Sequence, residues 1–141
     1  MCIRDSLKGP EAPLDGYSYT DKDGHRRSHG RVTWWDPAAT TLASGIRLGK
    51  GWQVLDPDEA PVGQLPDSPL PEWVRGITPT DPHRSPVCFG HYWFREEDGL
   101  EVIDNKAACV DYSAVKGGSL VAYRWSGESE LTTDNLFAVR S

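Results

Sequence analysis

The chain has 141 residues and a formal net charge of -6, with 26% charged and 38% hydrophobic residues. This length allows one domain with a real core, and the scattered basic residues exclude the positive surface typical of proteins that bind nucleic acid or anionic membranes. No apolar run approaches the roughly 20 residues of a membrane-spanning helix, and no signal peptide is recognisable. The three cysteines form no disulfide framework. We therefore expect a cytoplasmic protein with neither nucleic acid nor membrane as partner.

The first six residues, Met1–Ser6, resemble a translated sequencing adapter, and the expected fold does not include them. We therefore expect a C-terminal piece of a longer protein. Its expected parts are residues 1–6 as an adapter-derived artefact, residues 7–85 as a hairpin and loop insert, and residues 86–141 as the C-terminal β-sheet half of one incomplete domain.

A hairpin is predicted after a loop at residues 7–16. Residues 17–20 alternate as a half-buried strand does, Asp-Gly at residues 23–24 indicates a turn, and the return strand is expected over residues 25–35. The Asp-x-Asp-Gly sequence is not an EF-hand calcium loop, because its Gly stands at position 4 and Val32 occupies position 12.

A short helix is predicted from Pro37 to about Ala43, with Asp36 as its N-cap. Residues 44–85 lack periodicity and are rich in Pro and Asp. A loop of this length is usually functional or packed over a neighbouring element.

The most informative stretch is residues 86–94, Pro-Val-Cys-Phe-Gly-His-Tyr-Trp-Phe. Val, Cys and Phe between a proline and a glycine predict a short buried strand, and Gly90 allows the chain to turn sharply. His91 would then stand at the carboxyl end of the strand, as a metal ligand or general acid–base group. A half-buried histidine bonded to a neighbouring carbonyl is the alternative, and both remain open.

The remaining chain predicts successive short strands at residues 100–103, 107–112 and 119–125, with an edge strand within residues 131–139. A loop with the paired glycines Gly117 and Gly118 precedes the 119–125 strand, whose residues Leu120, Ala122 and Arg124 share one face. The pattern predicts a β-rich α+β fold.

Nucleophilic catalysis and zinc binding are poorly supported by spacing. Cys88 and His91 would point to opposite faces of a strand, and no second Cys/His pair has zinc-site spacing. Cys88 and Cys109 are expected to be reduced core thiols, and the adjacent Trp34 and Trp35 to supply core area rather than a ligand platform.

Three segments in order resemble the C-terminal part of bacterial calcineurin-like metallophosphoesterases, which resemble serine/threonine protein phosphatases and diadenosine-tetraphosphatases. They are Pro-Val-Cys-Phe-Gly-His-Tyr-Trp (86–93), Ala-Ala-Cys-Val-Asp-Tyr-Ser (107–113) and Lys-Gly-Gly-Ser-Leu-Val-Ala-Tyr-Arg-Trp (116–125). Residues 8–36 also resemble an insert carried by one bacterial subgroup. The resemblance covers nearly everything after residue 6.

This resemblance implies a four-layer α/β/β/α sandwich with two divalent metal ions of the Mn, Fe or Zn type. It makes His91 a metal ligand and places six residues at the rim of the site: Gly90, Tyr92, Asp111, Tyr112, Gly117 and Gly118. The implied substrate is a phosphate ester such as a phosphoprotein or a dinucleoside polyphosphate.

The family's other metal-binding motifs, Gly-Asp-x-His, Gly-Asp-x-x-Asp-Arg and Gly-Asn-His, are absent from the chain, and His25 and His29 match no ligand motif. We therefore expect the fragment by itself to be inactive and to bind no metal stably, its partner being the missing N-terminal half of the same domain. Two alternatives remain: a non-catalytic β-rich module that binds a ligand or protein, and an unrelated small enzyme using Cys88 or His91.

Overall fold

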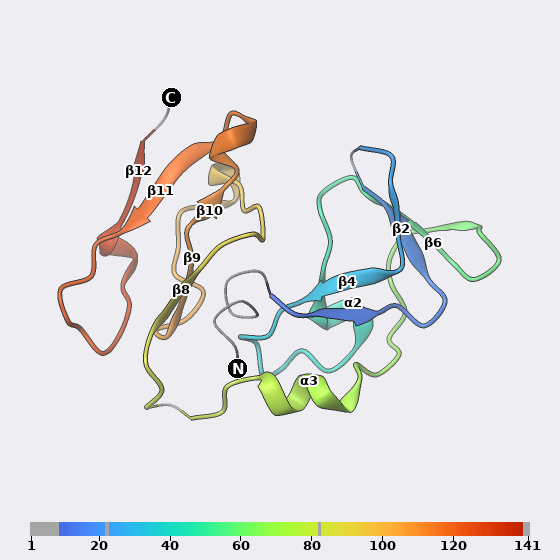
Figure 1. Ribbon diagram of the computed structural model, residues 1–141, viewed down its shortest axis with the longest axis horizontal. Coiled ribbons are helices and arrows are strands. Elements are labelled where there is room, and N and C mark those ends of the chain that lie inside the picture. The colour runs from blue at the N-terminus through green and yellow to red at the C-terminus, as the bar shows by residue number, and fades with distance from the viewer. Residues whose placement is uncertain (1–8, 22, 82, 140–141) are drawn as a thin grey trace. The chain divides into compact units, whose positions relative to one another are not determined.

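The structure is a computed structural model that describes residues 9–21, 23–81 and 83–139; the expectation for Met1–Ser6 lies outside these residues. The described chain forms two compact units, Gly9–Thr80 and the described part of Asp81–Ser141 (Figure 1). Short strands in several mainly antiparallel sheets dominate both units, with a few short helices, as expected for a β-rich α+β chain. Within the described ranges, no helix has the length and apolar character needed to cross a membrane.

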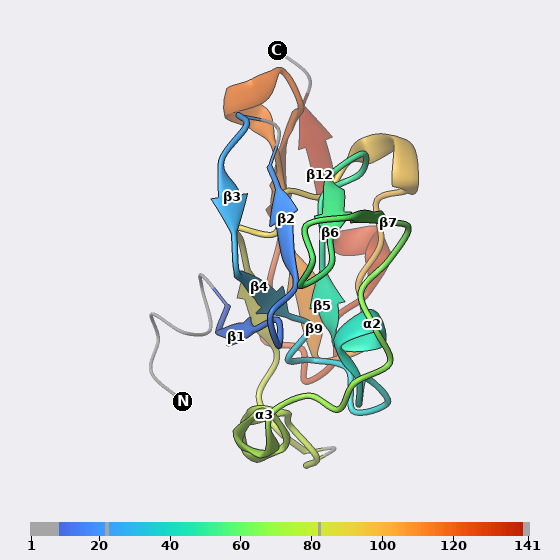
Figure 2. The ribbon, with the colours of Figure 1, turned by 90° about the vertical axis from the view of Figure 1, so that its right-hand side faces the viewer.

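Two antiparallel sheets build the Gly9–Thr80 unit. The first has the order β1 (Glu11–Pro13), β4 (His29–Val32) and β5 (Ile46–Arg47). The second has the order β3 (Arg26–Arg27), β2 (Ser18–Thr20), β6 (Gln53–Leu55) and β7 (Pro61–Val62), and Figure 2 shows these four strands side by side.

The predicted hairpin is confirmed at its turn. Strands β2 and β3 pair Tyr19 with Arg27, and the Asp21 carboxylate Oδ1 accepts hydrogen bonds from the backbone N–H groups of Asp23 and His25 at 3.0 and 2.9 Å. The single return strand expected over residues 25–35 is wrong. It is two strands, β3 and β4, because they pair in different sheets and the second ends at Val32.

The helix expected after Asp36 is also wrong. The Asp36 carboxylate accepts from the Ala38 N–H at 2.9 Å within a turn, and the helix α2 begins later, at Leu42–Gly45. Thr41 and Ser44 cap α2 reciprocally, and this capping box sets its start. The stretch 44–85 is not structureless, since it holds β5, β6, β7 and the helix α3 (Glu72–Ile77).

Apolar side chains from most of these elements, but not from β3 and β7, form the core of the Gly9–Thr80 unit. Trp34 and Trp35 are 0% and 6% exposed and meet edge to face with ring centroids 5.6 Å apart. The adjacent tryptophans therefore supply core area, as predicted, and their edge-to-face contact is a favoured aromatic geometry.

The second unit contains one parallel pair and one antiparallel sheet. Strand β8 (Val87–Phe89) runs parallel to β9 (Ala107–Cys109), with Phe89 opposite Cys109. The antiparallel sheet has the order β10 (Asp111–Tyr112), β11 (Ser119–Tyr123) and β12 (Leu136–Val139). Only Val110 separates β9 from β10, so the chain passes from one sheet to the other at this residue (Figure 1).

Three 3₁₀ turns complete this unit: η1 (Glu96–Asp98), η2 (Ala114–Lys116) and η3 (Thr133–Asn135). The strand expected at residues 100–103 does not form. The backbone N–H of Val102 donates to the Thr133 hydroxyl at 3.3 Å, and the side chain of Val102 packs against the core of Tyr112, Val121 and Leu136. The last strand is confined to Leu136–Val139 and lies at the sheet edge, as predicted.

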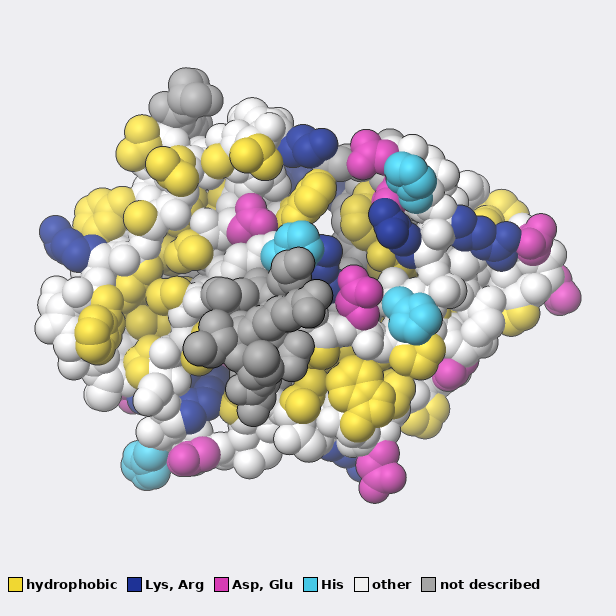
Figure 3. Space-filling model, viewed as in Figure 1, with side chains coloured by type: hydrophobic (Ala, Val, Ile, Leu, Met, Phe, Trp, Pro, Cys, Tyr) yellow, Lys and Arg dark blue, Asp and Glu magenta, His cyan; other side chains and the backbone are white. Residues whose placement is uncertain are grey.

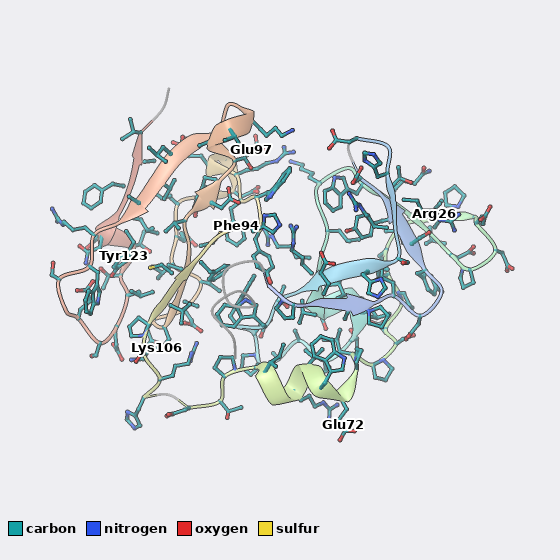
Figure 4. All side chains as sticks on the ribbon, in the orientation of Figure 1. Arg26, Glu72, Phe94, Glu97, Lys106 and Tyr123 are labelled. Carbon is teal, nitrogen blue, oxygen red and sulfur yellow. The ribbon has the colours of Figure 1, made fainter. Side chains whose placement is uncertain are left out.

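The loop between β11 and β12 is held by polar contacts. The buried Lys106 ammonium donates to the Ser129 carbonyl, and the Leu131 N–H donates to the Asn105 carbonyl at 2.8 Å. The Glu128 carboxylate accepts from the Tyr123 hydroxyl at 2.8 Å. Figure 4 labels Lys106 at the base of the β8–β9 pair and Tyr123 on β11. These contacts order a segment that lacks regular structure.

The sheet β10–β11–β12 has two different faces. Val121 and Leu136 face the core, each 6% exposed, whereas Leu120, Phe137 and Val139 are 66%, 44% and 64% exposed. Leu120 pairs with Val139 across the strands, and Ala122 with Phe137, so these residues form one exposed apolar face. Figure 3 shows hydrophobic side chains at the surface in this region.

Candidate functional site

The candidate site begins where β8 ends. Gly90 follows the strand, and His91 has a φ of +70°, in the left-handed region that side chains with a Cβ rarely adopt. This conformation reverses the chain directly after the parallel pair. The half-buried His91 consequently stands beyond the carboxyl end of β8, as the sequence predicts.

We call residues 90–94 the Gly-His turn. Two aromatic side chains anchor it: Tyr92, 5% exposed, lies edge to face with Phe89 at 5.3 Å, and Phe94 lies edge to face with Tyr112 at 5.9 Å. Phe94 is labelled in Figure 4. In this turn Tyr92 is buried, His91 and Phe94 are half-buried, and Trp93 is exposed.

Asp111 fastens the Gly-His turn to the start of β10. Its carboxylate Oδ2 accepts from the His91 N–H at 2.8 Å, and its carbonyl accepts from the Phe94 N–H at 2.9 Å. The other carboxylate oxygen, Oδ1, accepts from the Ser113 N–H at 3.0 Å. Segments 20 residues apart in sequence are thus joined through one aspartate.

The structure brings five of the predicted site residues into one cluster: Gly90, His91, Tyr92, Asp111 and Tyr112. Gly118 approaches the backbone of Tyr112 so closely that a Cβ on it would lie 2.0 Å from the Tyr112 carbonyl oxygen. Gly117 has a φ of +85° and open space around it. The backbone geometry at both positions requires glycine, whether or not a ligand binds nearby.

Sequence reasoning missed Ser113. This residue has a φ of +62°, donates its N–H to Asp111, and places its hydroxyl 3.4 Å from the Phe94 carbonyl. The signal was the Asp-Tyr-Ser sequence, since an aspartate often accepts from the backbone two residues later. Lys116 was also missed; its ammonium lies 5.9 Å from the centroid of the Trp93 ring.

Cys88 is exposed, so its expected place in the core is wrong, whereas Cys109 is buried as predicted. Desolvation and the negative charge of Glu128 raise the pKa of the Cys88 thiol. A raised pKa lowers the thiolate fraction at neutral pH, so Cys88 lacks the activated character of a catalytic cysteine.

Asp21, Asp23 and His25 offer ligand atoms within 4.8 Å of one another in the β2–β3 turn. Partial desolvation of Asp21 is outweighed by hydrogen bonds from the backbone of His25 and the side chain of Arg27, which lower the pKa of the Asp21 carboxyl. That carboxylate already accepts three hydrogen bonds within the hairpin. The Asp21 carboxylate therefore already has a structural role in the turn, and Asp23 and His25 are exposed beside it.

The cluster around His91 is the best-supported candidate site, because it joins a strained histidine to an aspartate at the end of a parallel strand pair. Comparison of the chain with protein-family models, with curated proteins and with solved structures finds no match. The assignment of a function consequently depends on the site and on the resemblance of its three sequence segments.

Proposed function

We propose that the chain is the C-terminal part of a metal-dependent phosphoric ester hydrolase of the calcineurin-like type, in which His91 is a metal ligand. The observation that carries this proposal is the position of His91, half-buried and left-handed directly beyond the β8–β9 pair. Left-handed backbone in a residue with a Cβ costs roughly 1–2 kcal/mol and is concentrated at functional sites. The first two family-like segments meet at this residue, and the third pairs with the second.

The His91 imidazole suits Mn, Fe or Zn, but the described residues do not complete a metal centre around it. Among the described residues 9–21, 23–81 and 83–139, the side chains that come close enough to hold a metal as a group of three lie in the β2–β3 turn, and His91 is not one of them. The other ligands would belong to the missing N-terminal half of the same domain. In the intact parent, two bound metal ions would supply an activated water and Lewis-acid stabilisation of the phosphoryl group.

The exposed apolar face of β11 and β12 supports an incomplete domain. A sheet with both faces apolar is usually covered on both, as in a layered sandwich. Leu120 and Val139 are about two-thirds exposed on the outer face. We propose that this sheet lies within the family's α/β/β/α sandwich, where the N-terminal half of the domain would cover it.

The test begins with the DNA upstream of the Met1 codon. An open frame that encodes the three missing metal-binding motifs is expected, and the extended protein should hydrolyse p-nitrophenyl phosphate with Mn²⁺, whereas the present chain should not. His91→Ala in the extended protein should lower kcat/KM at least about 100-fold, because removal of even an outer-shell partner of a metal costs about 10–100-fold.

His83→Ala is the matched control, since His83 is exposed in a separate turn of the same unit. Equal effects of the two substitutions would refute a ligand role for His91. A stop codon with a ribosome-binding site directly ahead of Met1 would refute the fragment proposal. The exposed apolar face would then favour the second candidate, a non-catalytic module that binds a protein through β11 and β12.

A further inference from the structure

Three residues around Asp111 that are not glycine have a left-handed backbone: His91, Trp93 and Ser113. His91 has a φ of +70° and Ser113 a φ of +62°, and both donate their N–H groups to the same carboxylate. Each conformation is unfavourable by itself for a residue with a Cβ. Hydrogen bonds to an ionised carboxylate are roughly twice as strong as neutral ones, so this contact opposes the strain at both positions.

The geometry of the turn links this backbone contact to the direction of the imidazole. The position of a Cβ follows from the backbone angles of its residue, so the His91 side chain starts in a direction that the left-handed conformation sets. Tyr92 and Phe94 anchor the rest of the Gly-His turn through ring contacts. The hydrogen bond from the His91 N–H holds the backbone at the residue that carries the imidazole.

We propose that Asp111 is a positioning residue that holds His91 in the left-handed conformation and so sets the direction of its imidazole. The functional meaning of this orientation rests on the proposed role of His91 as a metal ligand. Asp111 acts through both of its carboxylate oxygens and contacts the backbone of His91. Its carbonyl, which accepts from the Phe94 N–H, and the β10–β11 pairing both use its backbone and do not depend on the carboxylate.

Asp111→Asn tests this role in the present chain. An asparagine has the same shape, but its NH₂ group replaces one acceptor oxygen and its remaining oxygen carries no charge, so the hydrogen bond from the His91 N–H is lost in one orientation of the amide and weakened in the other. The readout is NMR of the uniformly labelled chain: the intraresidue amide–Hα NOE of His91, which is strong at positive φ, the amide exchange rate of His91, and the NOEs of its ring protons to neighbouring side chains.

In the unaltered chain we expect the strong intraresidue NOE and a protected His91 amide. Asp111→Asn should weaken the NOE, accelerate exchange of the His91 amide by about tenfold or more, and change the ring NOEs. The amide signal of Val121, in the strand β11 that pairs with β10, should keep its native position and show that the sheet remains folded. If Asp111 had only a structural role, Asp111→Asn would change the NMR signals of Val121 and His91 together.

Asp98→Asn is the control, because Asp98 is exposed, close to the same turn, and loses the same charge. The proposal is wrong if Asp111→Asn leaves the His91 NOE and exchange rate as they are in the Asp98→Asn protein. Absence of the strong NOE in the unaltered chain would refute it even if Asp111→Asn failed to fold. Neither result bears on the phosphatase assay of His91→Ala, so the two proposals fail separately.

Discussion

Adjacent glycines in the loop before β11 should respond very differently to the same substitution. A Cβ on Gly117 would meet no atom within 4 Å, whereas a Cβ on Gly118 would lie 2.0 Å from the carbonyl oxygen of Tyr112 and 3.0 Å from the Ser113 carbonyl carbon. Gly117 needs conformational freedom because its φ is +85°; Gly118 needs space. Substitution by alanine separates these two requirements.

The magnitudes follow from the geometry. Gly117→Ala adds a left-handed penalty of roughly 1–2 kcal/mol, which reduced entropy of the unfolded chain offsets by about 0.4–1 kcal/mol. The net loss of unfolding free energy is about 1 kcal/mol. Gly118→Ala must separate β10 from β11, where Tyr112 pairs with Ser119. Overpacking costs about 1–3 kcal/mol and each lost hydrogen bond about 0.5–1.5 kcal/mol, so we expect a loss of about 3 kcal/mol or more.

Urea unfolding provides the assay, followed through the native amide peak of Val121, which reports on the β11 sheet alone. With a slope of about 1 kcal/mol per molar urea, Gly117→Ala should lower the midpoint by about 1 M. Gly118→Ala should lower it about three times as far, or remove the native peak without urea.

Gly127→Ala is the matched control, because Gly127 has a φ of +99° and no atom within 4 Å of a Cβ. It should behave like Gly117→Ala. The reasoning fails if Gly118→Ala lowers the midpoint no more than these two substitutions do, since the close approach to Tyr112 would then not constrain the sheet.

Three further predictions concern single side chains. Lys106→Met should lower the free energy of unfolding by about 1–3 kcal/mol and speed proteolysis of the β11–β12 loop, because the Ser129 carbonyl loses its donor; unchanged cleavage rates would contradict this. Hydrogen bonds from its own backbone and from Ser126 lower the pKa of Glu128, so its contribution is present above pH 4.5 and is lost as pH falls through the lowered pKa. The Tm measured in thermal melts should therefore fall less steeply between pH 7 and pH 3 for Glu128→Gln than for the unaltered chain. Peptide mapping after iodoacetamide should show Cys88 modified well before Cys109, at a rate that still rises above pH 9 because the Cys88 pKa is raised; a plateau below pH 9 would refute that shift.

Local chemistry made several elements predictable from the sequence. The β8 strand follows from three apolar residues between Pro86 and Gly90, and the β11 faces follow from strict alternation. The β2–β3 turn follows from the Asp-Gly pair at residues 23–24, and in the structure Asp21 accepts its hydrogen bonds. In each case the interactions that determine the element lie within a few residues of one another, so the local sequence pattern is enough to predict it.

Elsewhere a competing contact determines the local structure. The helix expected after Asp36 begins instead at Leu42, where Thr41 and Ser44 form a capping box, whereas the Asp36 carboxylate caps only a turn. Residues 100–103 have the composition of a strand, yet the backbone of Val102 bonds to the Thr133 hydroxyl, which lies 31 residues away. Propensity is a weak preference that such tertiary contacts override.

The amino-acid pattern identifies the chemically distinctive residues of this chain: a Gly-His after a short apolar strand and an Asp-Tyr after the next one. Their meeting depends on tertiary packing. The parallel pairing of β8 with β9 places the Gly-His turn beside Asp111, and the carboxylate then reaches the His91 N–H at 2.8 Å. Pairing of strands 20 residues apart depends on the whole packed unit, which no local pattern encodes.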